Sequence, residues 1–240
     1  MTAKGEGAVR LPKRFYKTAT ASEEDGVHVV RLDGKIAKTR GGKRLQGRSA
    51  ALMSAIAEEW RRQGDHVDFA DMPLTQLAMT VADLGEISST EWRKAVISFL
   101  KADLLCYRAA EPDALVERQE AAWNPILDWA SQALGVRLLT GSGVAYIEQP
   151  EDAIMTAARI LDRFAPETLL VAKTATEVSG SAVIALALVR NAFPPGLLFD
   201  ASRVDEAFQA ERWGRDAEAC EREAKMRREF LAAADFLSLA

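Results

Sequence analysis

The hydrophobic residues change their period at Ser49, and this change most restricts how the chain can fold. Before it, apolar segments flank an Asp33-Gly34 pair. Asp-Gly between such segments favours a tight hairpin turn, because glycine tolerates positive φ. After it, apolar residues recur every three to four positions, as on the buried face of a helix. The sequence therefore predicts an α+β fold, with a small antiparallel β domain over residues 1–48 and a larger helical domain over 49–240.

Turn and breaker residues subdivide the β part. A first strand is expected to start at 15–17, and residues 36–39 are expected to return from the Asp33-Gly34 turn. Gly41-Gly42 predicts a second turn. Because an isolated hairpin is only marginally stable in water, this unit needs a third strand or a helix against it.

Start and stop signals subdivide the helical part. Asp71 is a candidate N-cap, and Ser88-x-x-Glu91 has the capping-box pattern that predicts another helix start. Pro112 is expected to open a further helix, which Pro125 should kink or restart. Residues 136–148 read as a second short hairpin.

Four helical segments are expected after this hairpin, near 151–165, 166–178, 180–193 and 201–237. The third is apolar nearly all round, which predicts a central buried helix. The last has a cap-like start at Ser202-x-x-Asp205, and Gly214 is expected to bend it.

Composition excludes several functional classes. The formal net charge of -4 argues against nucleic acid as the main partner. Two distant cysteines give no disulfide framework, and there is no long apolar run or secretory signal. We therefore expect a cytoplasmic protein, or one already processed, without stable membrane association.

The usual catalytic and cofactor motifs are missing from the sequence. His28 and His66 are its only histidines, and no metal-ligating, phosphate-loop or nucleophile-elbow pattern is present. No cofactor or metal is therefore expected. The charged residues after 200 are typical of a solvated helix face, although a pair of carboxylates in a cleft would suit an enzyme of unfamiliar type.

Trp213 differs from the other four tryptophans, which lie on apolar faces. It stands among charged residues, next to Gly214. An aromatic side chain inside a polar rim is typical of an interface anchor, and simple packing is the alternative.

An ordered series of short motifs runs along nearly the whole chain. Its members are Arg14-Phe15-Tyr16-Lys17, Leu32-Asp33-Gly34-Lys35, Lys38-Thr39, Glu58-Glu59-Trp60, Gln63, Met72-Pro73-Leu74-Thr75, Leu77, Thr80, Asp103, Gln119, Trp123-x-Pro125, Trp129, Ser202, Glu206, Gln209 and Trp213-Gly214. Each motif alone is weak, but their order and spacing are fairly specific. The series resembles the assembly chaperones of the catalytic head of ATP synthase, and among them the factor that holds the free α subunit.

The resemblance implies a chaperone without nucleotide hydrolysis. It also implies that an acidic residue in the Glu-x-x-Gln-x-x-x-Trp-Gly stretch is important, here Glu206 or its neighbour Asp205. We expect Glu206, Gln209 and Trp213 to share one helix face and to contact the α subunit. After Trp-Gly the chain has Arg215-Asp216 and no histidine, which indicates a bacterial relative. The resemblance thus implies a protein of the bacterial cytoplasm, with eukaryotic relatives in the mitochondrial matrix, and we expect it to be monomeric.

Two other functions remain open at this stage. The first is the enzyme of unfamiliar type with C-terminal carboxylates in a cleft. The second is a structural subunit, which would stay bound to its partner permanently instead of releasing it.

Overall fold

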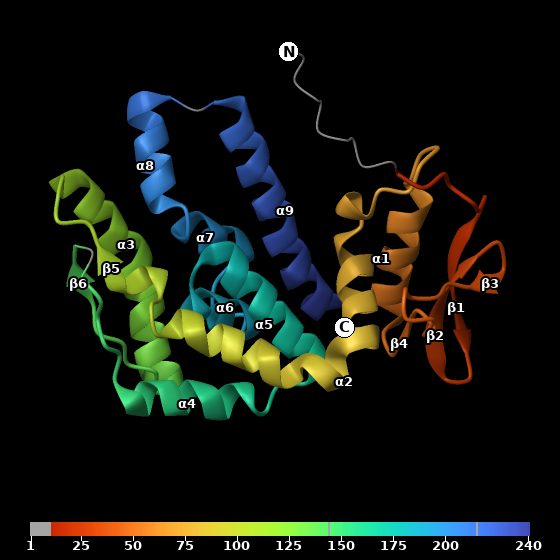
Figure 1. Cartoon of the computed structure of the whole chain (residues 1–240), viewed down its shortest axis with the longest axis horizontal. Helices are drawn as coiled ribbons and strands as arrows, with labels where there is room; N and C mark the ends of the chain where they lie inside the picture. Colours follow the sequence, from red (N-terminus) through yellow and green to blue (C-terminus); the bar gives the residue numbers. More distant parts are fainter. Residues whose placement is uncertain (1–10, 144, 215) are drawn as a thin grey trace, which may run out of the picture. The chain divides into compact units, whose positions relative to one another are not determined.

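The computed structural model describes residues 11–143, 145–214 and 216–240 (Figure 1). The chain divides into two compact units, one extending to Ala82 and including the last two residues, the other running from Asp83 to Ser238. The first contains an antiparallel sheet and the second is mainly helical, which confirms the α+β class. The domain boundary expected after residue 48 follows the change of period and stays a prediction.

The first unit is built on a four-stranded antiparallel sheet in which β2 pairs with each of the other three strands. Its elements are β1 (Ala19–Glu24), β2 (Val27–Leu32), β3 (Lys35–Ile36), β4 (Gln46–Gly47), α1 (Ala50–Arg61), the short helix η1 (Phe69–Asp71) and the start of α2 (Pro73–Leu100).

Two tight turns order this sheet. Asp33 and Gly34 have φ of 48° and 78° and join β2 to β3, as the sequence predicted. Asp25 and Gly26, with φ of 55° and 76°, join β1 to β2 in the same way. This second Asp-Gly turn escaped the sequence analysis, although it carries the same signal.

The first strand starts later than expected. The backbone N–H groups of Lys17 and Thr18 donate to a carboxylate oxygen of Asp33, at 2.9 and 2.8 Å. The backbone at Lys17 and Thr18 is therefore tied to a side chain in the neighbouring turn, and β1 begins only at Ala19.

The predicted helix after Ser49 is confirmed. The Ser49 hydroxyl accepts the N–H of Leu52 and caps α1. The helix packs on β1 and β2 and buries one stripe, which consists of Leu52, Met53, Ile56, Ala57 and Trp60. This packing supplies the partner that a small sheet needs.

The start of α2 is capped by a different carboxylate from the one expected. Both Glu59 oxygens accept backbone N–H groups of the first turn, from Leu74 at 2.8 Å and from Thr75 at 2.7 Å. Burial raises the pKa of Glu59 above its ordinary value. Asp71 lies in η1 instead, so its prediction as the cap was wrong.

The expected helix start at Ser88 was also wrong, because α2 is continuous from Pro73 to Leu100. The hydroxyl of the adjacent Ser89 donates to the carbonyl of Gly85 inside the helix, at 2.5 Å. Such back-bonding lets serine sit within a helix without ending it.

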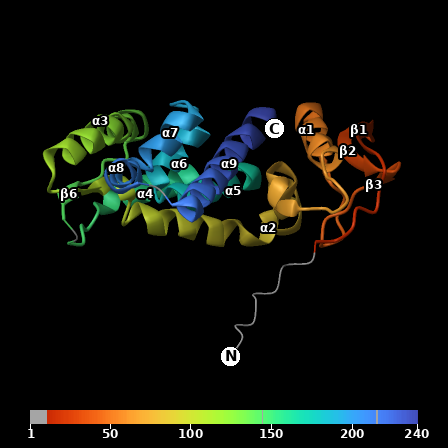
Figure 2. The ribbon, with the colours of Figure 1, turned by 90° about the horizontal axis from the view of Figure 1, so that it is seen from above.

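The second unit comprises the rest of α2 and most of the remaining elements, seen from above in Figure 2. These are η2 (Leu104–Cys106), β5 (Tyr107–Arg108), α3 (Asp113–Trp129), a π-helical turn η3 (Ala130–Leu134), β6 (Gly141–Ser142), α4 (Glu151–Leu161), α5 (Pro166–Ser179), α6 (Ala182–Val189), α7 (Pro195–Ala201), α8 (Val204–Trp213) and α9 (Ala217–Leu239).

Helix α6 forms the centre of this unit, as predicted. Every residue from 182 to 188 is buried, and the helix packs on α3, α5 and α7. An all-apolar helix can be stable only when it is surrounded in this way.

Helix α3 continues through Pro125, so it does not restart there, and the alternative of a kink at Pro125 stays a prediction. The expectation of a second hairpin was wrong. The region 136–148, of which Val144 lies outside the described residues, forms no hairpin; β6 pairs in parallel with β5, at Tyr107–Gly141 and Arg108–Ser142. A short strand can thus find a distant partner that local turn signals do not reveal.

The expected final helix over 201–237 is instead divided. Gly214, with φ of 83° and ψ of 170°, ends α8, because that conformation is incompatible with a helix. The Ser202 hydroxyl donates to the Phe199 carbonyl at 2.6 Å and caps nothing in α8, whose N-cap is Arg203.

Asp103 is a fully buried carboxylate at the beginning of α6. Its two oxygens accept the backbone N–H groups of Leu105 and Val183, both at 3.1 Å. Burial penalises the charged form and raises the pKa of Asp103 from 3.8 to about 6. The carboxylate thus binds the N-terminus of the central helix, and the desolvation of its charged form lowers the free energy of unfolding by an amount that depends on pH.

Replacing Asp103 by asparagine tests this cost. Since the folded-state pKa is raised, the unfolded chain loses this proton first, and the free energy of unfolding falls as pH rises from about 4 to about 6. The wild-type stability minus that of Asp103→Asn should therefore decrease by roughly 3 kcal/mol between about pH 4 and pH 7. Urea titrations at several pH values measure this difference. The exposed Asp128→Asn is the control, and a pH-independent difference for Asp103→Asn would contradict the assignment.

Candidate partner-binding surface

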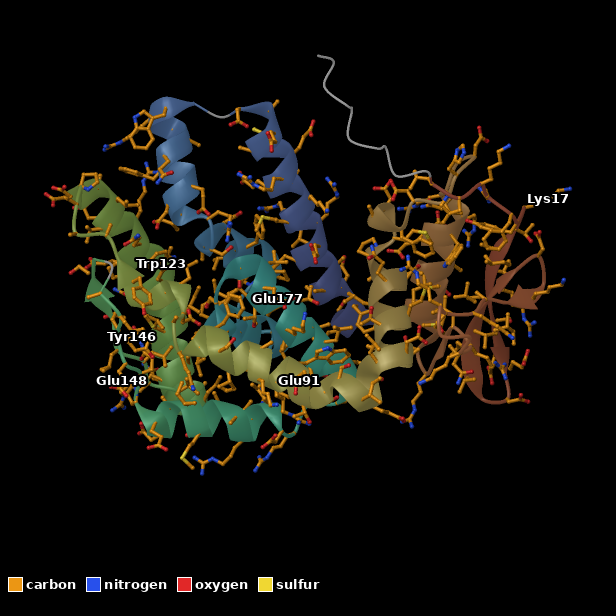
Figure 3. The ribbon with its side chains drawn as sticks, in the orientation of Figure 1. Lys17, Glu91, Trp123, Tyr146, Glu148 and Glu177 are labelled. Atoms are coloured by element: carbon orange, nitrogen blue, oxygen red, sulfur yellow. The ribbon has the colours of Figure 1, made fainter. Side chains whose placement is uncertain are left out.

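Helix α8 is fastened to α3 through one of its faces. Phe208 is buried there, and Arg118 of α3 lies over its ring with 5.2 Å between the guanidinium carbon and the ring centroid. The same guanidinium makes two bonds to the Glu211 carboxylate, of 2.8 and 2.7 Å. Trp123, labelled on α3 in Figure 3, donates its indole N–H to the Ala201 carbonyl at the end of α7.

Asp205 belongs to this fastened face. Its Oδ1 accepts the side-chain N–H of Gln119 at 2.7 Å, while the Gln119 Oε1 accepts the backbone N–H of Ala109 at 2.8 Å. Gln119 is 1% exposed, and these two bonds give a partner to each end of its buried amide. Asp205 therefore helps to hold α8 in place and points away from the open side of the helix.

The open side of α8 carries the other three candidate residues. Glu206, Gln209 and Trp213 line one cavity of about 310 Å³. Trp213 is 78% exposed, which makes it the most exposed of the large hydrophobic side chains in the described part of the chain. The expected shared face of these three residues is thus present, and Asp205 is not on it.

Arg203 orients the glutamate of this face. Its guanidinium lies 3.1 Å from the Glu206 carboxylate and also donates to the carbonyls of Val178 and Ser179 at the end of α5. The Arg203 side chain is largely buried, whereas that of Glu206 is 58% exposed. Glu206 is therefore anchored at the helix base while its carboxylate reaches solvent.

The opposite wall of the cavity is the first half of α9. Asp216 caps this helix by accepting the N–H of Ala219 at 2.6 Å. None of the described residues from 217 to 229 is buried, in contrast to Phe230 and Phe236 further along. Helix α9 thus reaches the core only through its second half, and its first half borders an open groove.

Sequence reasoning missed the α9 side of this groove. The missed lining residues are Asp216, Ala219, Arg222, Glu223 and Met226. The available signal was Gly214, because a complete break there turns the chain back and brings the next helix alongside α8.

Two features are absent from residues 11–143, 145–214 and 216–240. These residues contain no cluster of three or more His, Cys, Asp or Glu side chains arranged to hold a metal ion. Within the same residues, no helix combines the length and hydrophobicity required to cross a membrane.

Comparison with known proteins decides the family. The model of the ATP12 chaperone protein family matches residues 13–131. The crystal structure of Atp12 from Paracoccus denitrificans is 31% identical, with a TM-score of 0.84 over 95% of this chain and 98% of that one. The chain belongs to the ATP12 chaperone family. This is the family of ATP synthase assembly chaperones that the ordered motifs indicated.

Further relatives agree with this assignment. A candidate chaperone from Agrobacterium tumefaciens is 36% identical, with a TM-score of 0.89 over 95% of this chain and 86% of its own. A lysine-for-aspartate mutant of the Paracoccus Atp12 is 30% identical, with a TM-score of 0.86 over 95% of this chain and 97% of the mutant. The mitochondrial atp12 protein of Schizosaccharomyces pombe is 27% identical over 157 residues, or 62% of this chain, but this segment spans only 54% of the yeast protein.

Gln119→Leu tests whether the buried amide holds α8. The substitution leaves the Ala109 N–H and one bond of the Asp205 carboxylate without a partner, so we expect a loss of about 1–3 kcal/mol in the free energy of unfolding. Urea unfolding monitored by circular dichroism measures it. Gln132→Leu, at an exposed glutamine, should change stability little, and equal effects of the two substitutions would contradict the role of Gln119.

Proposed function

We propose that this chaperone binds the unassembled α subunit of the ATP synthase catalytic head and keeps it from aggregating until assembly. It acts as a monomer in the bacterial cytoplasm. Family membership supports the chaperone role, and the bacterial sources of the relatives support the compartment. The observation that carries the proposal is the exposed Trp213 beside an open groove. The acidic side chain of this groove, Glu206, is held by an ion pair with the largely buried Arg203.

The physical rationale lies in the surface that an unassembled subunit exposes. A subunit of a ring has apolar surface intended for its neighbours, and such patches aggregate when they are uncovered. An exposed tryptophan supplies a large contact area at a small entropic cost. The carboxylate of Glu206 supplies orientation, because complementary charges favour one way of docking over others.

Co-expression with the isolated α subunit from the same source tests the proposal. We expect the α subunit to become soluble and to co-elute with this chain in gel filtration. An α subunit that precipitates despite abundant soluble chaperone would overturn the proposal. Turnover of a small substrate, together with a higher melting temperature of the protein in the presence of that substrate, would instead favour the enzyme alternative.

Glu206→Lys should weaken capture of the α subunit and leave folding nearly intact. The carboxylate is exposed, so charge reversal affects the docked partner more than the core. We expect at least about a tenfold loss of affinity, equivalent to ~1.4 kcal/mol. Glu218→Lys, at an exposed position outside the groove lining, is the control. Undiminished co-elution with Glu206→Lys would exclude Glu206 from the contact.

Trp213→Ala should likewise reduce binding, by about 2 kcal/mol if the tryptophan is a central anchor. The melting temperature should hardly change, because the side chain is 78% exposed. Tyr146→Ala is the matched control: this aromatic residue is 68% exposed and lies near β6, outside the groove lining (Figure 3). Equal effects of both substitutions on titration with the α subunit would count against Trp213 as the anchor.

A further inference from the structure

The chain segment before β1 exposes alternate side chains. Lys13, Phe15 and Lys17, the last labelled in Figure 3, are exposed, whereas Arg14 is half-buried and Tyr16 is buried. Such alternation is typical of an extended backbone, on which every second side chain lies on the same face. Phe15 is 71% exposed, so a large apolar ring stands on this face between two lysines.

The inward side chains hold this segment against α1. The Tyr16 hydroxyl donates to the Trp60 carbonyl at 2.7 Å, and the Arg14 guanidinium donates to the carbonyl of Gln63, just beyond the end of the helix. The Phe15 ring meets the rings of Tyr16 and Trp60 edge to face, with 5.2 and 6.5 Å between centroids. The exposed ring is therefore supported by two buried ones.

One backbone edge of this segment is paired and the other is open. Lys13 forms an antiparallel bridge with His66, closed by backbone hydrogen bonds of 2.8 and 2.9 Å from the neighbouring residues. Because hydrogen-bonding groups of successive residues in a strand alternate between its two edges, those of Lys13 and Phe15 point away from this bridge. Within the described part of the chain, the N–H and C=O groups of these two residues take part in no hydrogen bond. The open edge ends at Lys17, whose N–H donates to the Asp33 carboxylate at 2.9 Å.

The charge of this face favours an acidic occupant. Neither Lys13 nor Lys17 forms an ion pair with any residue that the structure describes, and the exposed His66 lies directly opposite Lys13. Asp33 is near Lys17, but both of its oxygens already accept backbone N–H groups. Lysines also protect exposed strand edges from unwanted pairing. Protection alone would not place an exposed phenyl ring between them, because such a ring favours pairing.

A short segment suits this face better than an extended polyanion. Residues 11–82 contain 12 basic and 9 acidic side chains, whereas residues 83–238 contain 17 basic and 25 acidic ones. The net negative charge of the whole chain repels a nucleic acid or an anionic membrane. A peptide segment of a few residues interacts mainly with the charges within a Debye length of ~8 Å, which here are those of residues 13–17.

We propose that the open edge of residues 13–17 binds an extended acidic segment of a protein partner by strand addition. The segment pairs with the N–H and C=O groups of Lys13 and Phe15. It places an apolar side chain on Phe15 and a carboxylate beside each lysine, because directly opposite residues of paired strands lie on one face. In strand addition, backbone bonds supply affinity and alternate side chains supply specificity. The inference goes beyond the proposed function and does not depend on α8.

A peptide titration of the full chain tests the inference. The probe is an acetylated and amidated Glu-Thr-Val-Thr-Glu peptide, in which valine lies between two glutamates at alternate positions. In isotope-labelled protein we expect the NMR amide signals of Lys13 and Phe15 to shift and their hydrogen exchange to slow, because these N–H groups gain acceptors. Lys-Thr-Val-Thr-Lys is the matched control peptide. Equal shifts with both peptides, or no shift with the acidic one, would overturn the inference.

Charge reversal at the edge separates recognition from a structural effect. Lys13→Glu should weaken binding of the acidic peptide about fivefold and strengthen binding of the lysine-flanked peptide, because opposite charges on paired strands attract. A merely structural effect would weaken both. Lys35→Glu, at an exposed lysine of β3 away from the open edge, is the control. Unchanged affinities of Lys13→Glu for both peptides would overturn the charge pairing.

Phe15→Ala should weaken binding of the acidic peptide by a similar factor of about five, because the valine loses its cross-strand partner. Tyr146→Ala, which removes an aromatic side chain of nearly equal exposure from the second unit, is the matched control. Circular dichroism and the melting temperature confirm that each variant is folded. Equal affinities of the two variants would remove Phe15 from the contact and overturn the inference.

The remaining outcomes separate the alternatives. If vesicles of phosphatidylglycerol or single-stranded DNA shift the amides of Lys13 and Phe15 and the acidic peptide does not, the face binds a membrane or a nucleic acid, and the inference is overturned. A chain that retains the α subunit but not the peptide overturns this inference alone. A chain that binds the peptide but leaves the α subunit insoluble overturns the proposed function alone.

Discussion

The second unit depends on burying one entirely apolar helix. Helix α6 has no polar face, so it requires neighbours on all sides, and α3, α5 and α7 supply them. Its N-terminus is satisfied by the buried Asp103 carboxylate, a charge that is tolerated only because backbone N–H groups surround it. With α6 fixed, α3 becomes a rigid support, and α3 in turn holds α8 through Phe208, Arg118 and Gln119.

The support from α3 explains how the exposed face of α8 can be well ordered. A short helix such as α8 would be marginal by itself in water. It is stabilised by packing on one face, so the other face can carry Glu206 and Trp213 without contributing to the core. In helix α9 the buried and exposed parts follow one another along the chain. Phe230 and Phe236 anchor its second half in the core, while its first half is not buried. Folding thus depends on one face of these helices, and the other face is left for the proposed contact with a partner.

Local signals in the sequence predicted much of this architecture. The Asp33-Gly34 turn, the helix that starts after Ser49 and the buried helix near 180–193 each depend on a few neighbouring residues, and all are present. The failures involve partners distant in sequence. Asp33 captures the backbone before β1, Glu59 takes the capping role expected of Asp71, and β6 pairs with β5. Only the folded chain brings such groups together.

The candidate site shows the same division. Helical spacing correctly grouped Glu206, Gln209 and Trp213, but it could not show that the adjacent Asp205 is bonded to Gln119. That bond joins residues 86 positions apart. The α9 wall was also inaccessible to sequence reasoning, because a glycine that bends a helix and one that ends it look alike. At Gly214 the difference decides whether a groove exists.

Hydrogen–deuterium exchange of the chain, alone and with the isolated α subunit, tests the central claim most directly. The account predicts fast amide exchange in the first half of α9 in the free chain, because no residue from 217 to 229 is buried. It predicts marked slowing there and along α8 when the α subunit binds. Protection confined to the sheet of the first unit, with α8 and α9 unchanged, would contradict it.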